Sequence, residues 1–361
     1  MNSRPKIPKI DLFLEEMLSK HASDLHIVPN LRPKYRIYGE LVDLDFPPIP
    51  SQSCTEYLLG LLDRAQKEDL FKHKDLDFLY VTPQGNRFRV NYFFQNQGLA
   101  AVFRSVPTKI LNFEKLNLPS HLEHFAQIRS GLILFTGPTG AGKSTTLASL
   151  IHYINNRLRR HIITLENPIE FVHTSNRSII HQREIGTHVA SFEEGIIEAS
   201  RQDPDIVLVG ELIEPRVIRL TCSLAETGVL TLATLHTNSA AQTLDRIIDV
   251  FPVNQQPQIR AMLAQCLKGI FSQILLKTRD GTGRIPAYEV LFSSSPVANM
   301  IREGKVSEIQ SYIQRSRSQG IVSLDSTLEQ LLEKRKIHPE DAYMVAVDKT
   351  RFEKYLPSHS L

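Results

Sequence analysis

Residues 137–144 read Gly137-Pro138-Thr139-Gly140-Ala141-Gly142-Lys143-Ser144, which is the G-x-x-x-x-G-K-[ST] spacing of a phosphate-binding loop. The apolar run 132–136 precedes the loop and has the length and composition of a buried strand. Apolar residues then recur at helical spacing, at Leu147, Leu150, Ile151, Ile154 and Leu158. Because such a loop works between a strand and a helix, this order predicts a nucleoside triphosphate site on an α/β fold.

The residue types in the loop account for this chemistry. Glycines let successive backbone N–H groups curl around a phosphate, and the helix that follows adds the positive end of its dipole. The Lys143 ammonium would reach the β- and γ-phosphates, and the Ser144 hydroxyl would ligate Mg²⁺. We therefore expect ATP and Mg²⁺ as cofactors.

Composition limits the class of protein. The chain has 361 residues, 42% hydrophobic residues and a formal charge of +3, so it is long enough for two packed domains and only mildly basic. With no strip of interleaved basic and aromatic residues, direct nucleic-acid binding is not expected. No apolar run reaches the ~18 residues of a membrane span. Three scattered cysteines and a start unlike a signal peptide indicate a cytoplasmic protein.

Hydrophobic periodicity divides the chain into segments. Residues 1–106 mix helical and strand patterns and are typical of an α+β domain, and 107–118 lack any steady period and are expected to be a linker. Strands alternate with helices over 119–295, as in a mostly parallel sheet with flanking helices. Two edge strands are expected at 274–276 and 287–290. The pattern from 296 to 361 is helical.

Three polar residues follow predicted strands of this sheet: Glu166 after 162–165, Glu211 after 206–210, and His236 after 232–235. The carboxyl ends of parallel strands form the ligand-binding edge of open α/β sheets. ATP hydrolysis needs a carboxylate that orients water and a group that senses the γ-phosphate. The usual magnesium-binding Asp is absent after the second of these strands, where Gly210-Glu211 stands, so Glu211 is expected either to hold the metal or to act as the catalytic carboxylate.

Several longer motifs resemble one family. They are the stretch 136–147 around the loop, Glu166-Asn167-Pro168-Ile169-Glu170-Phe171, the segment 203–211 and Thr234-Leu235-His236-Thr237. All resemble the secretion and type IV pilus ATPases. The segments 22–26, 87–91, 101–104, 178–184, 245–252 and 299–305 are most similar to the pilus retraction motors of the PilT/PilU type, so the resemblance covers nearly the whole chain.

The resemblance implies a RecA-like motor core, a PAS-like amino-terminal domain and a carboxyl-terminal helical segment. It also implies a homo-hexamer that powers pilus retraction from the cytoplasmic side of the inner membrane, against a platform protein and with a paralogous ATPase as a further partner. It extends the phosphate site from Gly137 to Thr145, with Pro138, Thr139, Gly140, Ala141, Gly142, Lys143 and Ser144 between them. It makes Arg87, Arg89 and Arg104 the candidates for fingers that reach a neighbouring subunit's nucleotide.

Some positions depart from the family pattern. Asn167 replaces an Asp beside Glu166, and Val229 replaces the first histidine of the histidine box. Leu212-Ile213-Glu214 replaces a Met-Arg-Asp sequence, and Pro296 and Ala298 replace Ala and Arg. These departures keep open a slow, nucleotide-gated accessory subunit. An assembly or secretion ATPase is the other alternative within the superfamily.

Overall fold

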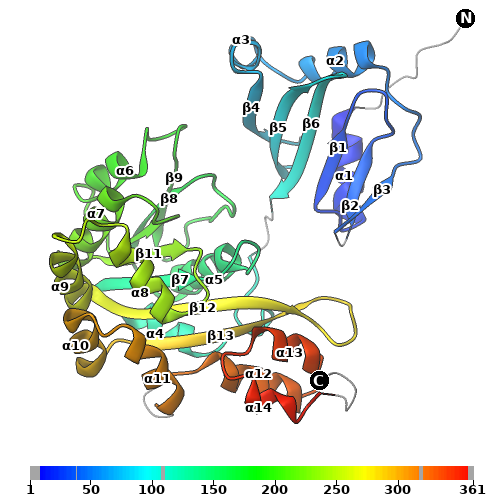
Figure 1. Ribbon diagram of the computed structural model, residues 1–361. Coiled ribbons are helices and arrows are strands. Elements are labelled where there is room, and N and C mark those ends of the chain that lie inside the picture. The colour runs from blue at the N-terminus through cyan, green and yellow to red at the C-terminus, as the bar shows by residue number, and fades with distance from the viewer. Residues whose placement is uncertain (1–8, 38, 107–109, 317–319, 357–361) are drawn as a thin grey trace, which may run out of the picture. The chain divides into compact units, whose positions relative to one another are not determined.

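The computed structural model describes residues 9–37, 39–106, 110–316 and 320–356. The sequence-based predictions for residues 1–8, Tyr38, 107–109, 317–319 and 357–361 therefore concern residues outside the described part. The chain divides into two compact units, Met1–Lys109 and Ile110–Leu361 (Figure 1). The second unit begins within the segment expected to be a linker. Phe113 is buried there and its ring stacks on Tyr153 with centroids 5.2 Å apart, so this part of the segment is packed onto the second unit.

The first unit is a six-stranded antiparallel sheet in the order β3-β2-β1-β6-β5-β4. Its strands are β1 Asp24–Ile27, β2 Lys34–Ile37, β3 Glu40–Asp43, β4 Asp75–Val81, β5 Arg87–Gln95 and β6 Gly98–Val106, and its helices are α1 Ile10–Ser19, α2 Ser51–Leu59 and α3 Arg64–His73. The helix α3 and the strand β4 were not predicted from the sequence. The α3 helix nevertheless begins with a capping box between Asp63 and Gln66, a local start signal.

Alternation along these strands separates an apolar face from a polar one. Leu25, Phe88 and Phe103 lie in one buried cluster with residues of α1 and α2. Register places Arg36, Asp24, Arg104 and Arg89 on the other face, directly opposite one another across β2, β1, β6 and β5. The polar face thus carries a row of arginines around one carboxylate.

The second unit contains a seven-stranded sheet in the order β13-β12-β7-β11-β10-β8-β9. All neighbouring pairs are parallel except β12 with β13. The strands are β7 Gly131–Thr136, β8 His161–Glu166, β9 Ile179–Glu184, β10 Ile206–Val209, β11 Leu230–Leu235, β12 Leu267–Lys277 and β13 Arg284–Phe292. The helices up to β12 are α4 His121–Gln127, α5 Lys143–Arg157, α6 Phe192–Ala199, α7 Pro215–Glu226, α8 Ala240–Asp249 and α9 Gln256–Cys266.

The two faces of this sheet have separate cores. On one face, Leu134, Leu165 and Val209 pack with residues from α6 to α11. On the other, Ile133, Phe135 and Leu208 pack with α4 and α5. Strands buried on both faces explain why 132–135 and 206–209 are continuously apolar rather than alternating.

Two expectations about this sheet were wrong in detail. The two expected edge strands are longer, and β12 lies between β7 and β13, so it is an internal strand. The strand β9 was missed; it pairs in parallel with β8 along its whole length and forms the opposite edge. Four of its six residues, His181, Gln182, Arg183 and Glu184, are polar, as suits an edge strand with a neighbour on one side only within the described sheet.

The carboxyl-terminal helices are α10 Ser295–Glu303, α11 Ser307–Arg315, α12 Leu324–Glu333, α13 Pro339–Val345 and α14 Thr350–Glu353. One isolated bridge, Val290 to Val322, interrupts this helical region. The last three helices form a core with Leu276, Ile285 and Ala287 of the β12–β13 hairpin, and Figure 1 shows them beside that hairpin. Buried Asp325 accepts hydrogen bonds from the Val347 and Asp348 N–H groups. These bonds attach the segment that follows α13 to the helix α12.

Candidate nucleotide site

The glycine-rich loop lies between β7 and α5, at the centre of the sheet. Gly137, Gly140 and Gly142 have φ angles of 149°, 79° and 86°, a region in which other residues are strained. The α5 helix begins at Lys143 immediately after Gly142. The structure therefore forms the expected strand–turn–helix, with a helix amino terminus directed at the loop.

Gln273 of β12 supports this loop from behind. Its Nε2 donates to the Ala141 carbonyl at 2.6 Å, and its Oε1 accepts from the Thr146 hydroxyl at 2.8 Å. The Ala141 carbonyl shares a peptide plane with the Gly142 N–H, so a bond to one sets the direction of the other. A Cβ at Gly142 would lie 2.9 Å from Gln273 Nε2. The loop conformation therefore depends on both the glycine and the glutamine.

Lys143, His236 and Glu211 form a continuous polar chain. Lys143 Nζ donates to the Gly137 carbonyl at 2.8 Å and lies 3.3 Å from His236 Nδ1, and His236 Nε2 lies 2.9 Å from Glu211 Oε1. Because an ammonium only donates, Nδ1 of the neutral ring accepts, which leaves the ring proton on Nε2 to face Glu211. Burial lowers the pKa of Lys143, and the nearby charges of Glu211 and Glu170 oppose that shift.

Glu166 occupies the end of β8. Its Oε1 accepts hydrogen bonds from the Thr164 hydroxyl at 2.6 Å and from Gln182 Nε2 at 3.2 Å. Burial raises the pKa of Glu166, while these two hydrogen bonds act in the opposite direction. A carboxylate with a raised pKa and a fixed orientation is suited to general-base catalysis.

These residues surround one cavity of about 380 Å³, a size typical of small-ligand sites. Its wall includes the loop residues 139–145, Glu166, Asn167, Glu211 and His236. Loop N–H groups, the Lys143 ammonium, the Ser144 hydroxyl and the carboxylates of Glu166, Glu170 and Glu211 suit a triphosphate with a bound magnesium ion. The residues present therefore fit ATP and Mg²⁺.

The three candidate finger arginines belong to the first unit and are described within it. Arg104 Nε lies 2.7 Å from Asp24 Oδ1, and Arg89 Nε lies 3.7 Å from Asp77 Oδ1. Asp24 is 3% exposed, whereas the Arg104 side chain is 66% exposed. The carboxylate therefore holds Arg104 at its base and leaves the guanidinium accessible. Arg87 pairs across strands with Val106 and Val81.

Val229 does not belong to the cavity. It precedes β11 and is packed in the core with α7 and α8, whereas His236 follows the other end of that strand. A six-residue strand separates its ends by ~20 Å. A side chain at position 229 therefore lies in the core and away from the cavity.

Gln273, Gln182 and Arg284 also contribute to this region and were not predicted from the sequence. Gln182 and Gln273 support Glu166 and the loop from strands whose neighbours are distant in sequence. Arg284 lines the cavity and donates to the Gly140 carbonyl at 3.4 Å. No local motif marks it, because the segment before it is an ordinary hairpin turn.

Comparisons with known proteins agree with this arrangement. Residues 1–340 match the family described as type II/IV secretion system protein. A twitching motility protein of Neisseria gonorrhoeae is 41% identical over 86% of this chain and 83% of its own. The type IV pilus retraction ATPase PilT of Pseudomonas aeruginosa is 41% identical over 89% and 93%. A crystal structure of the pilus retraction motor PilT with bound ADP covers 96% of this chain and all of that one, with a TM-score of 0.89 and 38% identity.

The fold and its cavity define an α/β ATPase. The matches extend over both units of the chain, so they are not confined to the loop that most ATPases share. The chain belongs to the type II/IV secretion system protein family and, within it, to the pilus retraction ATPases of the PilT type.

Proposed function

We propose that this protein hydrolyses ATP to power retraction of a type IV pilus, as a homo-hexamer at the inner-membrane pilus machinery. The observation that carries the proposal is the chain from Lys143 through His236 to Glu211. It connects the phosphate loop to the ends of two neighbouring strands, so the state of the phosphate is relayed to the carboxylate beside it. No helix in the described ranges is long and apolar enough to cross a bilayer. Docking on a platform protein is therefore the proposed route to the membrane.

In this proposal the loop 137–145 binds the phosphates and Lys143 supplies the charge at the β- and γ-phosphates. Ser144 and Glu211 would hold Mg²⁺, which would neutralise charge that develops on the phosphate oxygens. Glu166 orients the attacking water, because its raised pKa and its bonds to Thr164 and Gln182 suit a base. His236 senses the phosphate between Lys143 and Glu211.

Three substitutions test these roles. Lys143→Ala should abolish turnover and greatly weaken nucleotide binding. Glu166→Gln should lower kcat by about 10²–10³-fold with affinity near wild type, as expected of a transition-state role. Glu211→Gln should raise the Mg²⁺ concentration needed for ATP binding. ATPase rates and titrations with a fluorescent ATP analogue give these values. A Lys143→Ala protein with unchanged rate and affinity would refute the site.

We also infer a RecA-like core and a PAS-like first domain, and that Arg87, Arg89 and Arg104 act on a neighbouring subunit's nucleotide. The exposed guanidinium of Arg104 on its Asp24 anchor supports this role. Mixing Lys143→Ala with Arg104→Ala subunits should then recover part of the activity, because some interfaces carry both intact groups. Mixed hexamers without recovered turnover would contradict Arg104 as a finger in trans.

A slow accessory subunit is the second candidate, and Asn167 favours it. Asn167 lines the cavity directly beside Glu166, where an acidic residue would add negative charge near the base. Asn167→Asp should then raise the ATPase rate. An unchanged or lower rate would remove the structural support for a slow paralogue.

A further inference from the structure

The β12–β13 hairpin forms a wall of the nucleotide cavity. Register places Arg284 of β13 opposite Lys277 and Pro286 opposite Leu275, so Gln273, Leu275 and Arg284 share one face of the hairpin. Gln273 is bonded to the loop, Leu275 lies 3.3 Å from where a Cβ at Gly142 would be, and Arg284 reaches the Gly140 carbonyl. These three side chains of one hairpin face therefore lie next to Ala141, Gly142 and Gly140 of the loop.

Among the described residues, two lysine or arginine side chains line this cavity: Lys143 and Arg284. Lys143 is engaged by two loop carbonyls and His236. Arg284 is exposed, and no carboxylate in the described parts of the chain forms an ion pair with it. Its bond to Gly140, at 3.4 Å, is long and leaves most of the guanidinium's five donors available. A cavity-lining guanidinium without an anionic partner is a natural ligand for phosphate.

The order of the strands separates the two cations. The loop leaves β7; β11, β10 and β8 lie on one side of that strand and β12 and β13 on the other. Lys143 is beside His236 at the end of β11, the side on which Glu211 and Glu166 also lie. Arg284 comes from the opposite side, away from those carboxylates. If water is activated on the carboxylate side, the γ-phosphate would lie on that side, and the hairpin side would face the phosphates nearer the ribose.

We propose that Arg284 is a nucleotide-binding residue that contacts a phosphate shared by ADP and ATP. The inference rests on the proposed function of the cavity and adds a second positive charge to it. It predicts that Arg284 stabilises ADP and ATP complexes equally, because the contacted phosphate is the same in both.

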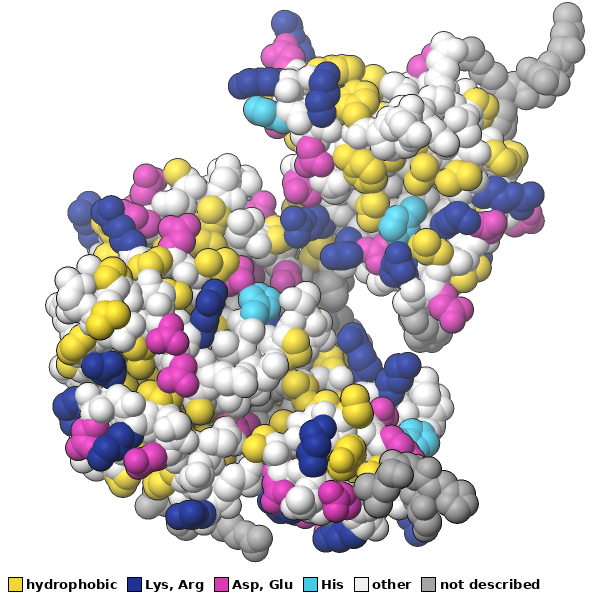
Figure 2. All heavy atoms as spheres, in the orientation of Figure 1, with side chains coloured by type: hydrophobic (Ala, Val, Ile, Leu, Met, Phe, Trp, Pro, Cys, Tyr) yellow, Lys and Arg dark blue, Asp and Glu magenta, His cyan; other side chains and the backbone are white. Residues whose placement is uncertain are grey.

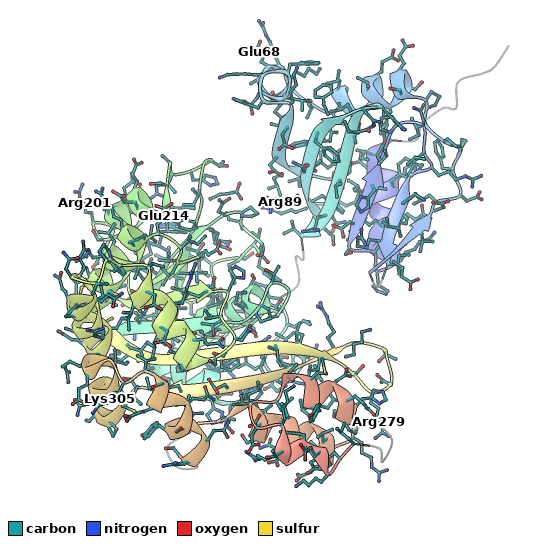
Figure 3. The ribbon with its side chains drawn as sticks, in the orientation of Figure 1. Glu68, Arg89, Arg201, Glu214, Arg279 and Lys305 are labelled. Carbon is teal, nitrogen blue, oxygen red and sulfur yellow. The ribbon has the colours of Figure 1, made fainter. Side chains whose placement is uncertain are left out.

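The test uses the full chain and measures the affinity for ADP and for the slowly hydrolysed analogue ATPγS by calorimetry. Arg284→Ala should weaken both by about tenfold, which is ~1.4 kcal/mol. Arg279→Ala is the matched control. Arg279 belongs to the turn of the same hairpin and its backbone N–H bonds to Lys336, and Figure 3 labels it near the carboxyl-terminal helices. Its loss should leave both affinities unchanged.

Arg284→Gln separates binding from support of the loop. A glutamine amide can still donate to a carbonyl but carries no charge, so it should bind both nucleotides as weakly as Arg284→Ala does. Wild-type affinity in Arg284→Gln would overturn the proposal in favour of a structural bond to Gly140. Equal affinities in the Arg284→Ala and Arg279→Ala proteins, or weakening of ATPγS alone, would also overturn it. Undiminished binding by Lys143→Ala would instead refute the proposed function.

Discussion

Replacing Gln273 by Leu should disturb the phosphate loop from outside the cavity. The substitution removes two hydrogen bonds, to the Ala141 carbonyl and from the Thr146 hydroxyl. Thr146 is 1% exposed and Gln273 is 4% exposed, so water does not replace these partners. At about 1–2 kcal/mol for each unsatisfied buried group, the cost is about 3 kcal/mol. For a unit of this size that lowers Tm by ~6–12 °C.

The same change should weaken nucleotide binding, because the freed Ala141–Gly142 peptide no longer holds the Gly142 N–H toward the phosphate. Ser272→Ala is the matched control. Ser272 precedes Gln273 and its hydroxyl bonds to the Thr136 hydroxyl at 2.7 Å, buried in the same strand pair. Its loss should lower Tm with little change in ADP affinity, whereas Gln273→Leu should change both.

A double-mutant cycle with Thr146→Val isolates the contact. The single Thr146→Val change leaves Gln273 Oε1 without its donor, and the double variant removes both partners. A coupling energy of about 1 kcal/mol in stability is expected for groups in direct contact. Thermal unfolding of the four proteins measures it. Coupling below about 0.3 kcal/mol, or unchanged ADP affinity in Gln273→Leu, would refute the inference that Gln273 positions the loop.

Three further predictions concern buried groups. Burial raises the pKa of Glu289 in the folded protein, so Glu289 stabilises the fold fully below the pKa that it has in the unfolded chain. This stabilisation is lost as pH rises through the pKa of the folded state. The Tm of Glu289→Gln minus that of wild type should therefore increase between pH 4 and pH 8, and a constant difference would contradict this. Asp325→Ala leaves two backbone donors unpaired and should cost about 3 kcal/mol, with faster proteolysis after α12; an unchanged Tm would contradict the anchor. Gly142→Ala should weaken ADP binding more than Gly140→Ala, because only the first Cβ meets Gln273; equal losses measured by titration would point to backbone strain alone.

Features encoded in short stretches of sequence were predictable. The loop, its flanking strand and helix, and the polar ends of three strands depend on residues within about ten positions of one another. Glu166, Glu211 and His236 line one cavity with the loop, because parallel strands bring their carboxyl ends to one edge.

Features that depend on pairing between distant segments were not predictable. The strand β9 is defined by its register with β8, and its mixed composition resembles a loop. Gln273 lies far along the chain from Thr146, and Arg284 reaches Gly140 only because β13 pairs with β12. Val229 occupies a family-motif position, yet it precedes β11 and lies in the core, which the motif alone does not indicate.

Charged side chains of both signs are mixed over the visible face of the second unit (Figure 2). The visible surface therefore offers no single basic region for a large polyanion. The first unit differs, because its polar sheet face carries the row formed by Arg36, Asp24, Arg104 and Arg89. Figure 3 labels Arg89 on that sheet.

The β12–β13 hairpin has one more consequence, for how mechanical load reaches the nucleotide. On one face its residues touch the phosphate loop, and on the other Leu276, Ile285 and Ala287 lie in the core of α12–α14. The loop and these helices therefore lie against opposite faces of the same two-stranded hairpin. Tension applied to the helices α12–α14 would act first on β12 and β13, because these helices share a core with that hairpin. A pulling force on that end of the chain would thus alter how long the nucleotide stays bound.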